Sequence, residues 1–387
     1  MRQLAARNVR QLAARTVGLL AVIVTSVVMA LAVGCAPVRT SETAAVSPVS
    51  GLPVLSFLSE FTRPAGTNYP QLSDSSRFGS LSGLAFDQAS GDWLAVADDR
   101  AGSRVAWLAI TAAGGRLDVT PRRMQALRAG PGIDRRTVTQ ADLEAIVAMP
   151  DGTFLMGEEG HTDKDNVWPP AILQVTRDGL VTGVVAYPLE FQVSIDGKAG
   201  IRDNQGFESL TRTPGGRVIA GLEQPTIDRP ITSFGHGGEG RLIEFEPSGA
   251  TFRAGRQWRY ALAPTPRSER FPNVCSDGEN GLVELLAITE TRLLALERAC
   301  LMTADRSAVF NPVQLFAVNL SGEAATKTLL LDLSTVIPSL SPAMARLDNF
   351  EGLAFGPPVN GARTLLVMSD DNFRQTQFTS LLLFGMK

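Results

Sequence analysis

Short hydrophobic runs that alternate with polar residues fill the chain from residue 51 to its end, separated by Gly, Pro, Asp and Asn. A hydrophobic period of two residues between turn-forming residues predicts β-strands joined by hairpins. Five segments share one order: a short strand, a turn, and a second hydrophobic strand that in most copies ends in acidic residues. These segments begin at Ser82, Leu143, Phe207, Val283 and Phe350.

The segments recur at a nearly regular spacing. With Ser82, Glu144, Glu208, Glu284 and Glu351 aligned, successive copies stand 62, 64, 76 and 67 residues apart. Four-stranded units repeated around an axis are the blades of a β-propeller, so the sequence predicts an all-β propeller. The first four units each have two further predicted strands: Val105–Ile110 and Leu117–Leu127, Ala171–Val175 and Leu180–Tyr187, Arg241–Phe245 and Thr251–Leu262, and Val313–Leu320 and Thr326–Leu333.

The fifth unit has three predicted strands, of which the last is Thr379–Phe384. Val54–Phe61 precedes the first unit and is predicted to supply the missing outer strand, which would close the ring and protect both sheet edges. Five blades are visible, and the longer interval between the third and fourth units could hold a sixth. Two separate β-sandwich domains are the alternative, but the regular repeat favours one propeller over residues 51–387.

Residues 1–35 have the features of a targeting segment. Four arginines precede the apolar run Val17–Val33, which is followed by Gly34 and Cys35. A charged start, an apolar middle and small residues at the end are typical of a secretory signal. Leu31–Cys35 resembles a bacterial lipobox, in which Cys35 would be lipidated, although Ala32 departs from the usual pattern. An uncleaved membrane anchor is the competing interpretation.

Residues 36–50 are rich in Ser, Thr, Pro and Ala and have no apolar period, so they are predicted to be a disordered tether. We therefore expect an exported protein of the cell envelope, either lipid-anchored or periplasmic, and a monomer. Cys275 and Cys300 are the cysteines that remain after Cys35. In an oxidising compartment two thiols favour a disulfide, and both are expected at the same end of the fourth blade.

Charge excludes one class of function. The whole chain has a formal charge of −3, and without the arginine-rich segment it has 32 basic against 39 acidic residues. No basic stripe that would bind nucleic acid is present. An acidic surface of this kind would instead attract cations.

The acidic residues are expected to converge on one rim of the propeller. In an antiparallel hairpin, the start of the first strand and the end of the second lie at the same end of the sheet. The candidate metal ligands there are Glu144, Glu208, Glu284, Glu351, Asp98, Asp370 and Asp371. The same rim is predicted to hold Asp99, Glu158, Glu159, Glu223, Glu297, Asp142, Asp203, Asn204, Asp277, Asn280, Asp348 and Asn349.

A glutamate inside a hydrophobic inner strand is unfavourable unless it has a partner. One partner is a hard cation such as Ca²⁺, which takes six to eight oxygen ligands. The other is arginine, because Arg100, Arg298 and Arg374 lie close to the acidic strand ends. From the sequence alone, the ring of acids therefore either holds metal or is braced by ion pairs.

Other reactive side chains are few. His161 follows Glu158 and Glu159 and is either an acid, base or ligand at the rim or an ordinary loop histidine. His236 lies in a glycine-rich loop without a phosphate-binding pattern. The sequence has no G-x-S-x-G motif, which argues against an esterase of the α/β-hydrolase type, and no Cys/His cluster with zinc spacing.

The repeated motifs F-E-G/S-L-A/T and L-E-A-I and the strand ends ADD, GEE and SDDN resemble the phytase-like family, named for esterase-like activity of phytase. The resemblance covers Leu55 to Phe384. It implies a β-propeller that hydrolyses phosphate or other esters with calcium held by acids at the channel mouth. By residue type, it implies Glu208, Glu351, Asp370 and Asp371 as calcium ligands and Arg100, Lys164, Arg298 and Arg374 as anion-binding groups. A full match to the catalytic pattern of true propeller phytases is absent.

The leading hypothesis is a Ca²⁺-dependent phosphoesterase or esterase that acts on a small substrate at the acidic mouth. Metal would neutralise substrate charge and lower the pKa of an attacking water, so no serine nucleophile is needed. Glu208, Glu351 and His161 are the candidate catalytic residues. The alternatives are a non-catalytic propeller that binds a ligand or another envelope protein, and a scaffold whose rim acids are paired with arginines.

Overall fold

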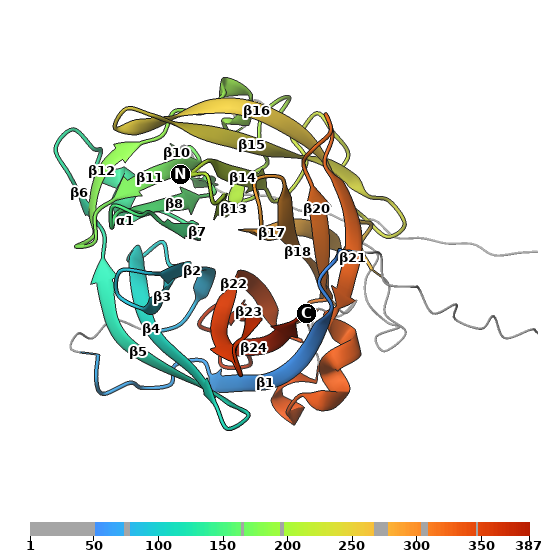
Figure 1. The fold of residues 1–387 in the computed structure, drawn as a ribbon. Helices are drawn as coiled ribbons and strands as arrows, with labels where there is room; N and C mark the ends of the chain where they lie inside the picture. Colours follow the sequence, from blue (N-terminus) through green and yellow to red (C-terminus); the bar gives the residue numbers. More distant parts are fainter. Residues whose placement is uncertain are drawn as a thin grey trace, which may run out of the picture. The chain divides into compact units, whose positions relative to one another are not determined.

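Five β-sheets are arranged around a central axis (Figure 1). The computed structural model describes residues 51–72, 78–163, 166–193, 197–266, 278–302, 309–345 and 347–387, which belong to one compact unit, Pro48–Lys387. The signal and tether predicted for residues 1–50 lie outside the described residues, as do Lys164, Cys275 and Asp277. In the described ranges, no helix has the length and apolar character needed to cross a membrane.

Each of these sheets is one propeller blade, and in the first four blades the four main strands follow sequence order from the axis outward. The first blade contains β2 (Leu81–Asp87), β3 (Asp92–Ala97), β4 (Arg104–Ala113) and β5 (Arg116–Ala126). The second contains β7 (Leu143–Ala148), β8 (Phe154–Glu158), β11 (Ala171–Val175) and β12 (Leu180–Val184), with the short β6 (Arg128–Ala129) parallel to β12. The third contains β13 (Phe207–Arg212), β14 (Val218–Leu222), β15 (Gly238–Ser248) and β16 (Thr251–Leu262).

The fourth and fifth blades contain the rest of the ring. The fourth is β17 (Glu279–Ala287), β18 (Arg292–Met302), β20 (Val313–Asn319) and β21 (Thr326–Asp332), with β19 (Val309–Phe310) paired to β18. The fifth is β22 (Asn349–Val359), β23 (Ala362–Asp370), β24 (Phe378–Met386) and β1 (Leu55–Pro64). The predicted all-β propeller with four-stranded blades is confirmed. The long third-to-fourth interval holds the β14–β15 loop and the long strands β15 and β16 in its described part, not a sixth sheet.

The N-terminal strand β1 is the outermost strand of the fifth blade. It runs antiparallel to β24, with Phe57 opposite Phe384 and Phe61 opposite Leu381. The rings of Phe57 and Phe384 meet edge to face at a centroid distance of 5.9 Å. Residues from the two ends of the described chain therefore share one sheet.

Short helical segments and one small hairpin fill the connections. They are α1 (Arg136–Thr139), the β9 (His161–Asp163) and β10 (Asn166–Trp168) hairpin, and the 3-10 segments Leu189–Phe191, Leu333–Ser339 and Pro342–Met344.

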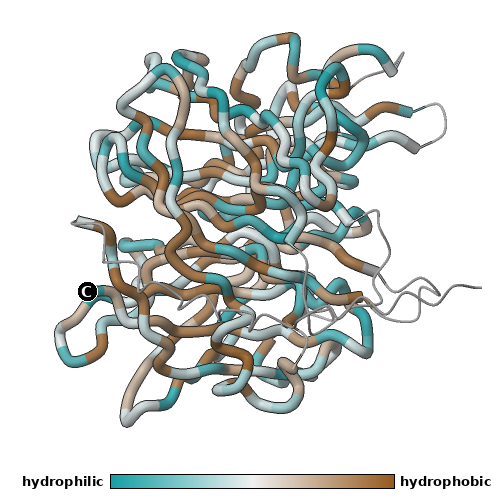
Figure 2. The backbone as a smooth tube through the Cα atoms, turned by 90° about the vertical axis from the view of Figure 1, so that its right-hand side faces the viewer, coloured by the Kyte–Doolittle hydropathy of each residue, from teal (hydrophilic) through white to brown (hydrophobic). Residues whose placement is uncertain are grey.

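The hydrophobic core consists of five clusters, each between two neighbouring blades. Between the first and second blades, for example, Val96 and Val105 pack with Phe154 and Leu173. The five inner strands also contact one another in a closed cycle: β2, β7, β13, β17 and β22. Hydrophobic residues accordingly follow the strands through the interior, while hydrophilic residues concentrate in loops and outer turns (Figure 2). Burial of both faces of each blade explains why the strands are so rich in aliphatic residues.

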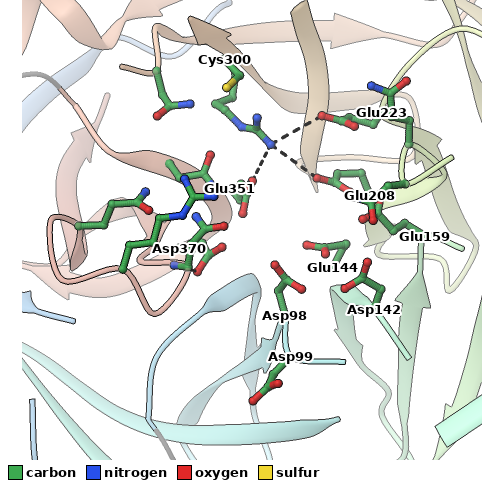
Figure 3. Close-up of a pocket in the computed structure, with 18 of the residues that line it drawn as sticks. Asp98, Asp99, Asp142, Glu144, Glu159, Glu208, Glu223, Cys300, Glu351 and Asp370 are labelled. Atoms are coloured by element: carbon green, nitrogen blue, oxygen red, sulfur yellow. Dashed lines mark hydrogen bonds and ion pairs between the residues drawn. The ribbon is translucent and has the colours of Figure 1, made fainter. Parts of the chain in front are cut away.

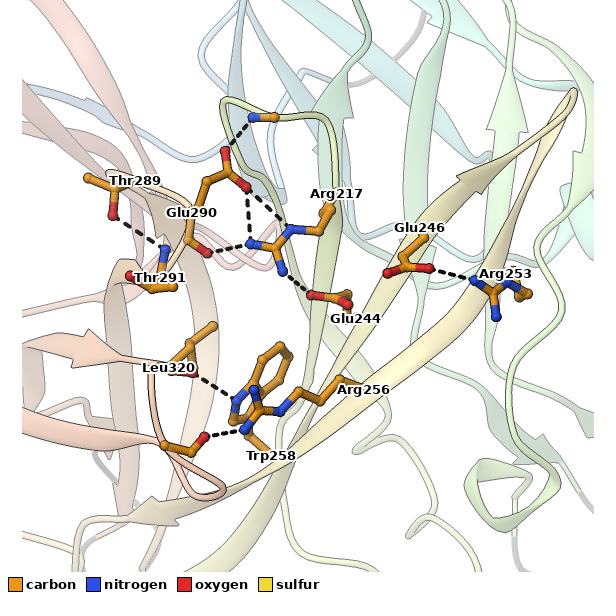
Figure 4. A network of polar contacts seen from close by, with 12 residues as sticks. Arg217, Glu244, Glu246, Arg253, Arg256, Trp258, Thr289, Glu290, Thr291 and Leu320 are labelled. Carbon is orange, nitrogen blue, oxygen red and sulfur yellow. Dashed lines mark hydrogen bonds and ion pairs between the residues drawn. The ribbon is translucent and has the colours of Figure 1, made fainter.

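Polar contacts add to this packing where the third and fourth blades meet (Figure 4). Arg217 forms an ion pair with Glu244 of β15 and another, at 3.0 Å, with Glu290 in the β17–β18 turn. Arg217 also donates to the backbone carbonyl of Glu290 at 2.8 Å. One guanidinium thus joins two blades far from the acidic rim.

Candidate metal centre

A cavity of about 610 Å³ opens at the mouth of the central channel (Figure 3). Its wall contains ten acidic side chains: Asp98, Asp99, Asp142, Glu144, Glu159, Glu208, Glu223, Glu279, Glu351 and Asp370. Three arginines, Arg100, Arg298 and Arg374, complete its charged lining. These residues come from all five blades, so propeller geometry brings strand ends that are far apart in sequence to one place.

A β-bulge near the start of every inner strand sets which residue faces the channel. In each inner strand, one residue has no partner on the neighbouring strand of the same blade. The unpaired residue lies between Ser82 and Leu84 in the first blade, Leu143 and Ala145 in the second, Phe207 and Ser209 in the third, Leu282 and Glu284 in the fourth, and Phe350 and Gly352 in the fifth. Bulges redirect side chains, and three of the bulged residues are Glu144, Glu208 and Glu351. The other two are Gly83 and Val283, so the alignment of Ser82 and Glu284 with the three glutamates was one residue out of register.

Five carboxyl groups form two overlapping triads on one side of the cavity. Asp98, Asp142 and Glu144 make the first, and Glu144, Glu159 and Glu208 make the second. Within each triad, one oxygen of every carboxyl group lies within 4.8 Å of the others. Figure 3 shows these side chains pointing toward one another. We refer to these five residues as the acidic cluster.

Several oxygens of the acidic cluster are buried and have no hydrogen-bond donor. They are Oδ1 of Asp142, Oε2 of Glu159 and Oε2 of Glu208, on side chains that are almost completely inaccessible to solvent. A buried carboxylate without a donor is strongly destabilised, so such oxygens require a cation or a proton.

Burial is the main reason why four carboxyl groups of the acidic cluster hold protons tightly. It raises the pKa of Glu144, Glu159, Glu208 and Asp98 well above the ordinary values for these groups, and the neighbouring carboxylates raise each pKa further. The close approach of like charges disfavours ionisation of them all. A bound divalent cation would reverse this preference.

Arg298 neutralises another part of the cavity. Its Nη2 lies 2.6 Å from Oε1 of Glu351, 3.6 Å from Oε1 of Glu223 and 3.9 Å from Oε1 of Glu208. Burial alone would lower the pKa of Arg298, but the charges of these glutamates outweigh burial and raise it. Asn349 also donates to Glu351, at 2.9 Å. The ring of acids is therefore of two kinds. Glu351, Glu223 and, at longer range, Glu208 are paired with Arg298, whereas Asp98, Glu144 and Glu159 have no ion pair in the described part of the chain.

Glu223 has a pKa that suits proton transfer. Burial raises the pKa of Glu223 to about 7, with Arg298 opposing the shift and Glu351 adding to it. A group with a pKa near the working pH is the most effective general acid or base.

The two remaining arginines lie at the edge of the cavity. Arg100 is 44% exposed and binds Asp142 through two hydrogen bonds to Oδ2, one of them 2.7 Å from Nε. Arg374 is exposed, and among the described residues its side chain forms no ion pair. Both lie where the cavity opens to solvent. Lys164, the fourth predicted anion-binding residue, lies outside the described residues.

Two predicted metal ligands are not part of the cavity wall. Asp371 accepts hydrogen bonds from the backbone of Ser80 at 2.8 Å and of Phe373 at 3.0 Å, and from the hydroxyl of Thr379 at 2.6 Å. These bonds occupy its oxygens and brace the contact between the fifth and first blades. Glu284 lies one residue past the bulge of β17, deeper in the channel.

Three further rim residues that the sequence singled out also lie elsewhere. Glu158 faces a different pocket beside Tyr187, and burial raises its pKa to about 8. His161 stacks on Trp168 at 4.7 Å and is not among the residues that line the cavity. Glu297 is fully buried and accepts hydrogen bonds from Tyr260, Asn280 and the backbone of Ala263. The structure thus places His161 outside the cavity wall.

The Glu284 carboxyl group accepts a hydrogen bond from the backbone amide of Leu285 at 3.0 Å and faces the backbone amides of Leu84 and Leu210. It therefore occupies the channel between three inner strands. Glu284→Ala is expected to reduce the free energy of unfolding by about 2–4 kcal/mol, because buried amides lose an acceptor. Calcium affinity should not change. Urea denaturation and calcium titration would test both expectations, with Glu284→Gln, which keeps an acceptor, as the milder control; a loss of calcium binding would contradict this assignment.

The predicted disulfide has no support in the structure. Cys300 is a free, partly buried thiol at the cavity wall, and burial raises its pKa. Cys275 lies outside the described residues, so the Cys275–Cys300 pair stays a prediction.

Glu279 and several amides that line the cavity were not predicted. Glu279 is the first residue of β17 and accepts a hydrogen bond from Gln205 at 2.8 Å. The sequence offered one indication that Glu279 lies at the site, namely its position just before the repeated motif of the fourth blade. The amides Gln205, Asn311 and Gln377 lie in loops outside the repeat, where the sequence pattern gave no signal. Asn372 ends the SDDN motif but was not singled out.

Residues 76–373 match the phytase-like family, described as esterase-like activity of phytase. The chain belongs to the phytase-like family. The matched range contains the whole acidic cluster, Arg100 and Arg298, and Arg374 lies one residue beyond it. No curated protein matches the phytase-like chain.

Several solved structures resemble the phytase-like chain at low sequence identity. An N-acetylgalactosamine deacetylase from F. plautii has a TM-score of 0.43 and 9% identity, with 85% of this chain and 95% of that chain covered. An endo-arabinase from Bacteroides thetaiotaomicron has a TM-score of 0.42 and 10% identity, with coverage of 85% and 96%. A luciferin-regenerating enzyme has a TM-score of 0.35 and 12% identity, with coverage of 87% and 95%. Similarities this low carry no information about substrate.

Proposed function

We propose that this phytase-like protein is a calcium-dependent hydrolase of phosphoric or carboxylic esters and that the acidic cavity is its active site. The observation that supports this proposal is the set of buried carboxylate oxygens in the acidic cluster that face one another without a donor. Ion pairs reach the acidic cluster at its two edges, through Arg100 on Asp142 and Arg298 near Glu208. They leave Asp98, Glu144 and Glu159 without a cation among the described residues, which a scaffold braced by ion pairs would not do.

The donor set fits calcium. All five groups of the acidic cluster are carboxylates, and hard oxygen ligands in irregular geometry favour Ca²⁺, whereas zinc sites use His and Cys. Asp98, Asp142, Glu144, Glu159 and Glu208 would hold the ion. Glu351 and Asp370 also line the cavity but lie outside both triads.

When bound, calcium would supply charge for the substrate oxyanion and lower the pKa of a coordinated water. The protein's own residues would do the rest. Arg374 would bind the negatively charged group of the substrate at the entrance, while Arg100 stays paired with Asp142. Glu223 would accept or return a proton, since its pKa is raised to about 7. Arg298 would keep Glu223 and Glu351 in place and would limit repulsion in the cavity.

Hydrolysis assays on the purified full-length protein would test the proposal. The substrates are p-nitrophenyl phosphate, bis(p-nitrophenyl) phosphate and p-nitrophenyl acetate, each with calcium and again after addition of EGTA. Hydrolysis of at least one ester should require calcium, and Glu223→Gln should reduce its kcat by about 10²-fold or more. If calcium binds but no ester is hydrolysed, the propeller is a binding module and not an enzyme.

We also propose export and attachment to the cell envelope through residues 1–35, with Cys35 as the lipidated residue. The arginines, the apolar run and the small residues before Cys35 support this proposal. Metabolic labelling with a fatty-acid analogue should mark the wild-type protein but not Cys35→Ala.

A further inference from the structure

We propose that the cavity accepts a singly phosphorylated, hydroxyl-rich ester, such as a sugar or polyol monophosphate, and discriminates against polyphosphates. This inference rests on the proposed hydrolase function and specifies its substrate class. Two independent features of the cavity wall support this inference: its excess of acidic side chains and its side-chain amides.

The charge of the wall disfavours a polyanion. Ten acidic side chains face three arginines, and two of these arginines are already engaged: Arg298 with Glu351 and Arg100 with Asp142. One Ca²⁺ would offset two charges and leave a formal acidic excess. Clefts lined by one sign of charge concentrate the field, so each further phosphate on a substrate meets increasing repulsion. Arg374 is the exposed cavity arginine without an ion pair in the described part of the chain. One unpaired arginine can neutralise one phosphate group.

The amides favour hydroxyl groups. Four of the six side-chain amides that line the cavity donate hydrogen bonds within the protein: Gln205 to Glu279, Asn349 to Glu351, Gln377 to Asp348 and Asn311 to a backbone carbonyl. The side-chain amides of Asn204 and Asn372 form no hydrogen bond with any described residue. A side-chain amide offers both donors and an acceptor, which suits a hydroxyl group in either role.

The backbone at these two positions is also unusual. Asn204 and Asn372 both adopt positive φ, 58° and 46°, a conformation in which asparagine is tolerated better than most residues. They come from the third and fifth blades, which are not neighbours in the ring, so they can contact one ligand from two sides. Asn372 is two residues before Arg374, so one loop presents an amide and a cation together. A cavity of about 610 Å³ is also in the range of small-molecule sites, about 300–1,000 Å³.

The test compares substrates that differ in charge. With the full-length protein and calcium, kcat/KM for glycerol 3-phosphate or glucose 6-phosphate is expected to exceed that for inositol hexakisphosphate at least tenfold. Added salt should raise kcat/KM for inositol hexakisphosphate, because screening weakens repulsion, and should leave p-nitrophenyl acetate hydrolysis almost unchanged. Equal or faster hydrolysis of inositol hexakisphosphate would overturn this inference but not the proposed function. Failure to hydrolyse any ester would overturn both.

A second test removes the amides without straining the backbone. Asn204→Gly and Asn372→Gly keep the positive φ, since glycine adopts it freely. Each change should raise KM for glucose 6-phosphate about fivefold or more while kcat changes less than twofold. KM for p-nitrophenyl phosphate, which has no sugar hydroxyl groups, should rise by a smaller factor. Asn360→Gly is the matched control, because Asn360 has a φ of 51° in the exposed β22–β23 turn away from the cavity. An unchanged KM in both variants would remove the amides from substrate recognition.

Discussion

Replacing Glu144 by glutamine is expected to abolish most of the rise in melting temperature that calcium causes. Glu144 belongs to both triads of the acidic cluster, so this change removes one ligand charge from each without altering shape. Calcium at 100 times its Kd stabilises the wild type by about 2.7 kcal/mol. At ~2–4 °C per kcal/mol, this is a shift of at least about 5 °C. A 100-fold loss of affinity leaves about 0.4 kcal/mol at the same calcium concentration. Differential scanning fluorimetry with and without calcium measures the shift.

Glu158→Gln is the matched control for this experiment. Glu158 is also a buried glutamate at the end of β8, immediately before Glu159, but it faces a different pocket. Its replacement should leave the calcium shift intact. Without calcium, Glu144→Gln should melt no lower than the wild type, because the change relieves repulsion within the acidic cluster. A full calcium shift in Glu144→Gln would show that the ion binds elsewhere.

Without calcium, the protein is expected to become less stable as pH rises from 5 to 8. Glu223 illustrates the direction of this pH dependence. Burial raises the pKa of Glu223 from 4.5 to about 7, so between these pH values the folded state binds more protons than the unfolded state. Stability is therefore greatest at the lower pH and is lost as pH rises through the folded-state pKa. A shift of this size corresponds to a change on the order of 3 kcal/mol. The raised pKa values of Glu144, Glu159 and Glu208 act in the same direction.

Urea denaturation in EGTA at several pH values, repeated with saturating calcium, measures this dependence. Calcium should flatten the profile because it replaces the protons that the acidic cluster otherwise holds. Glu223→Gln should also reduce the slope, since it removes one of the titrating groups. Stability in EGTA that increases between pH 5 and pH 8 would contradict the assignment.

The blades could be predicted from the sequence because their signals are local. Alternation with a period of two and Gly- or Asp-containing turns place each strand, as in Thr251–Leu262, which matches β16 residue for residue. The convergence of acids on one rim also follows from local geometry, since it needs no more than the direction of each hairpin. Asp98, Glu208 and Asp370 accordingly lie in the cavity wall.

The exact membership of the site could not be predicted, because one residue of register reverses the direction of a side chain. Glu284 and Val283 differ by one position at a bulge that no sequence pattern marks. Asp370 faces the cavity, whereas its neighbour Asp371 braces a turn. The division between metal-binding and ion-paired acids depends on Arg298, which reaches glutamates of the third and fifth blades from the fourth. Such a contact exists only after the ring has assembled.

The direction of β1 has a consequence for access to the cavity. Leu55, where the strand begins, pairs with Met386 at the end of β24, whereas Pro64 pairs with Phe378 near the acidic rim. The polypeptide therefore enters the propeller on the face opposite the acidic mouth. As a result, the point where the chain joins the ring does not obstruct the entrance of the cavity, which is open to any solute that diffuses there.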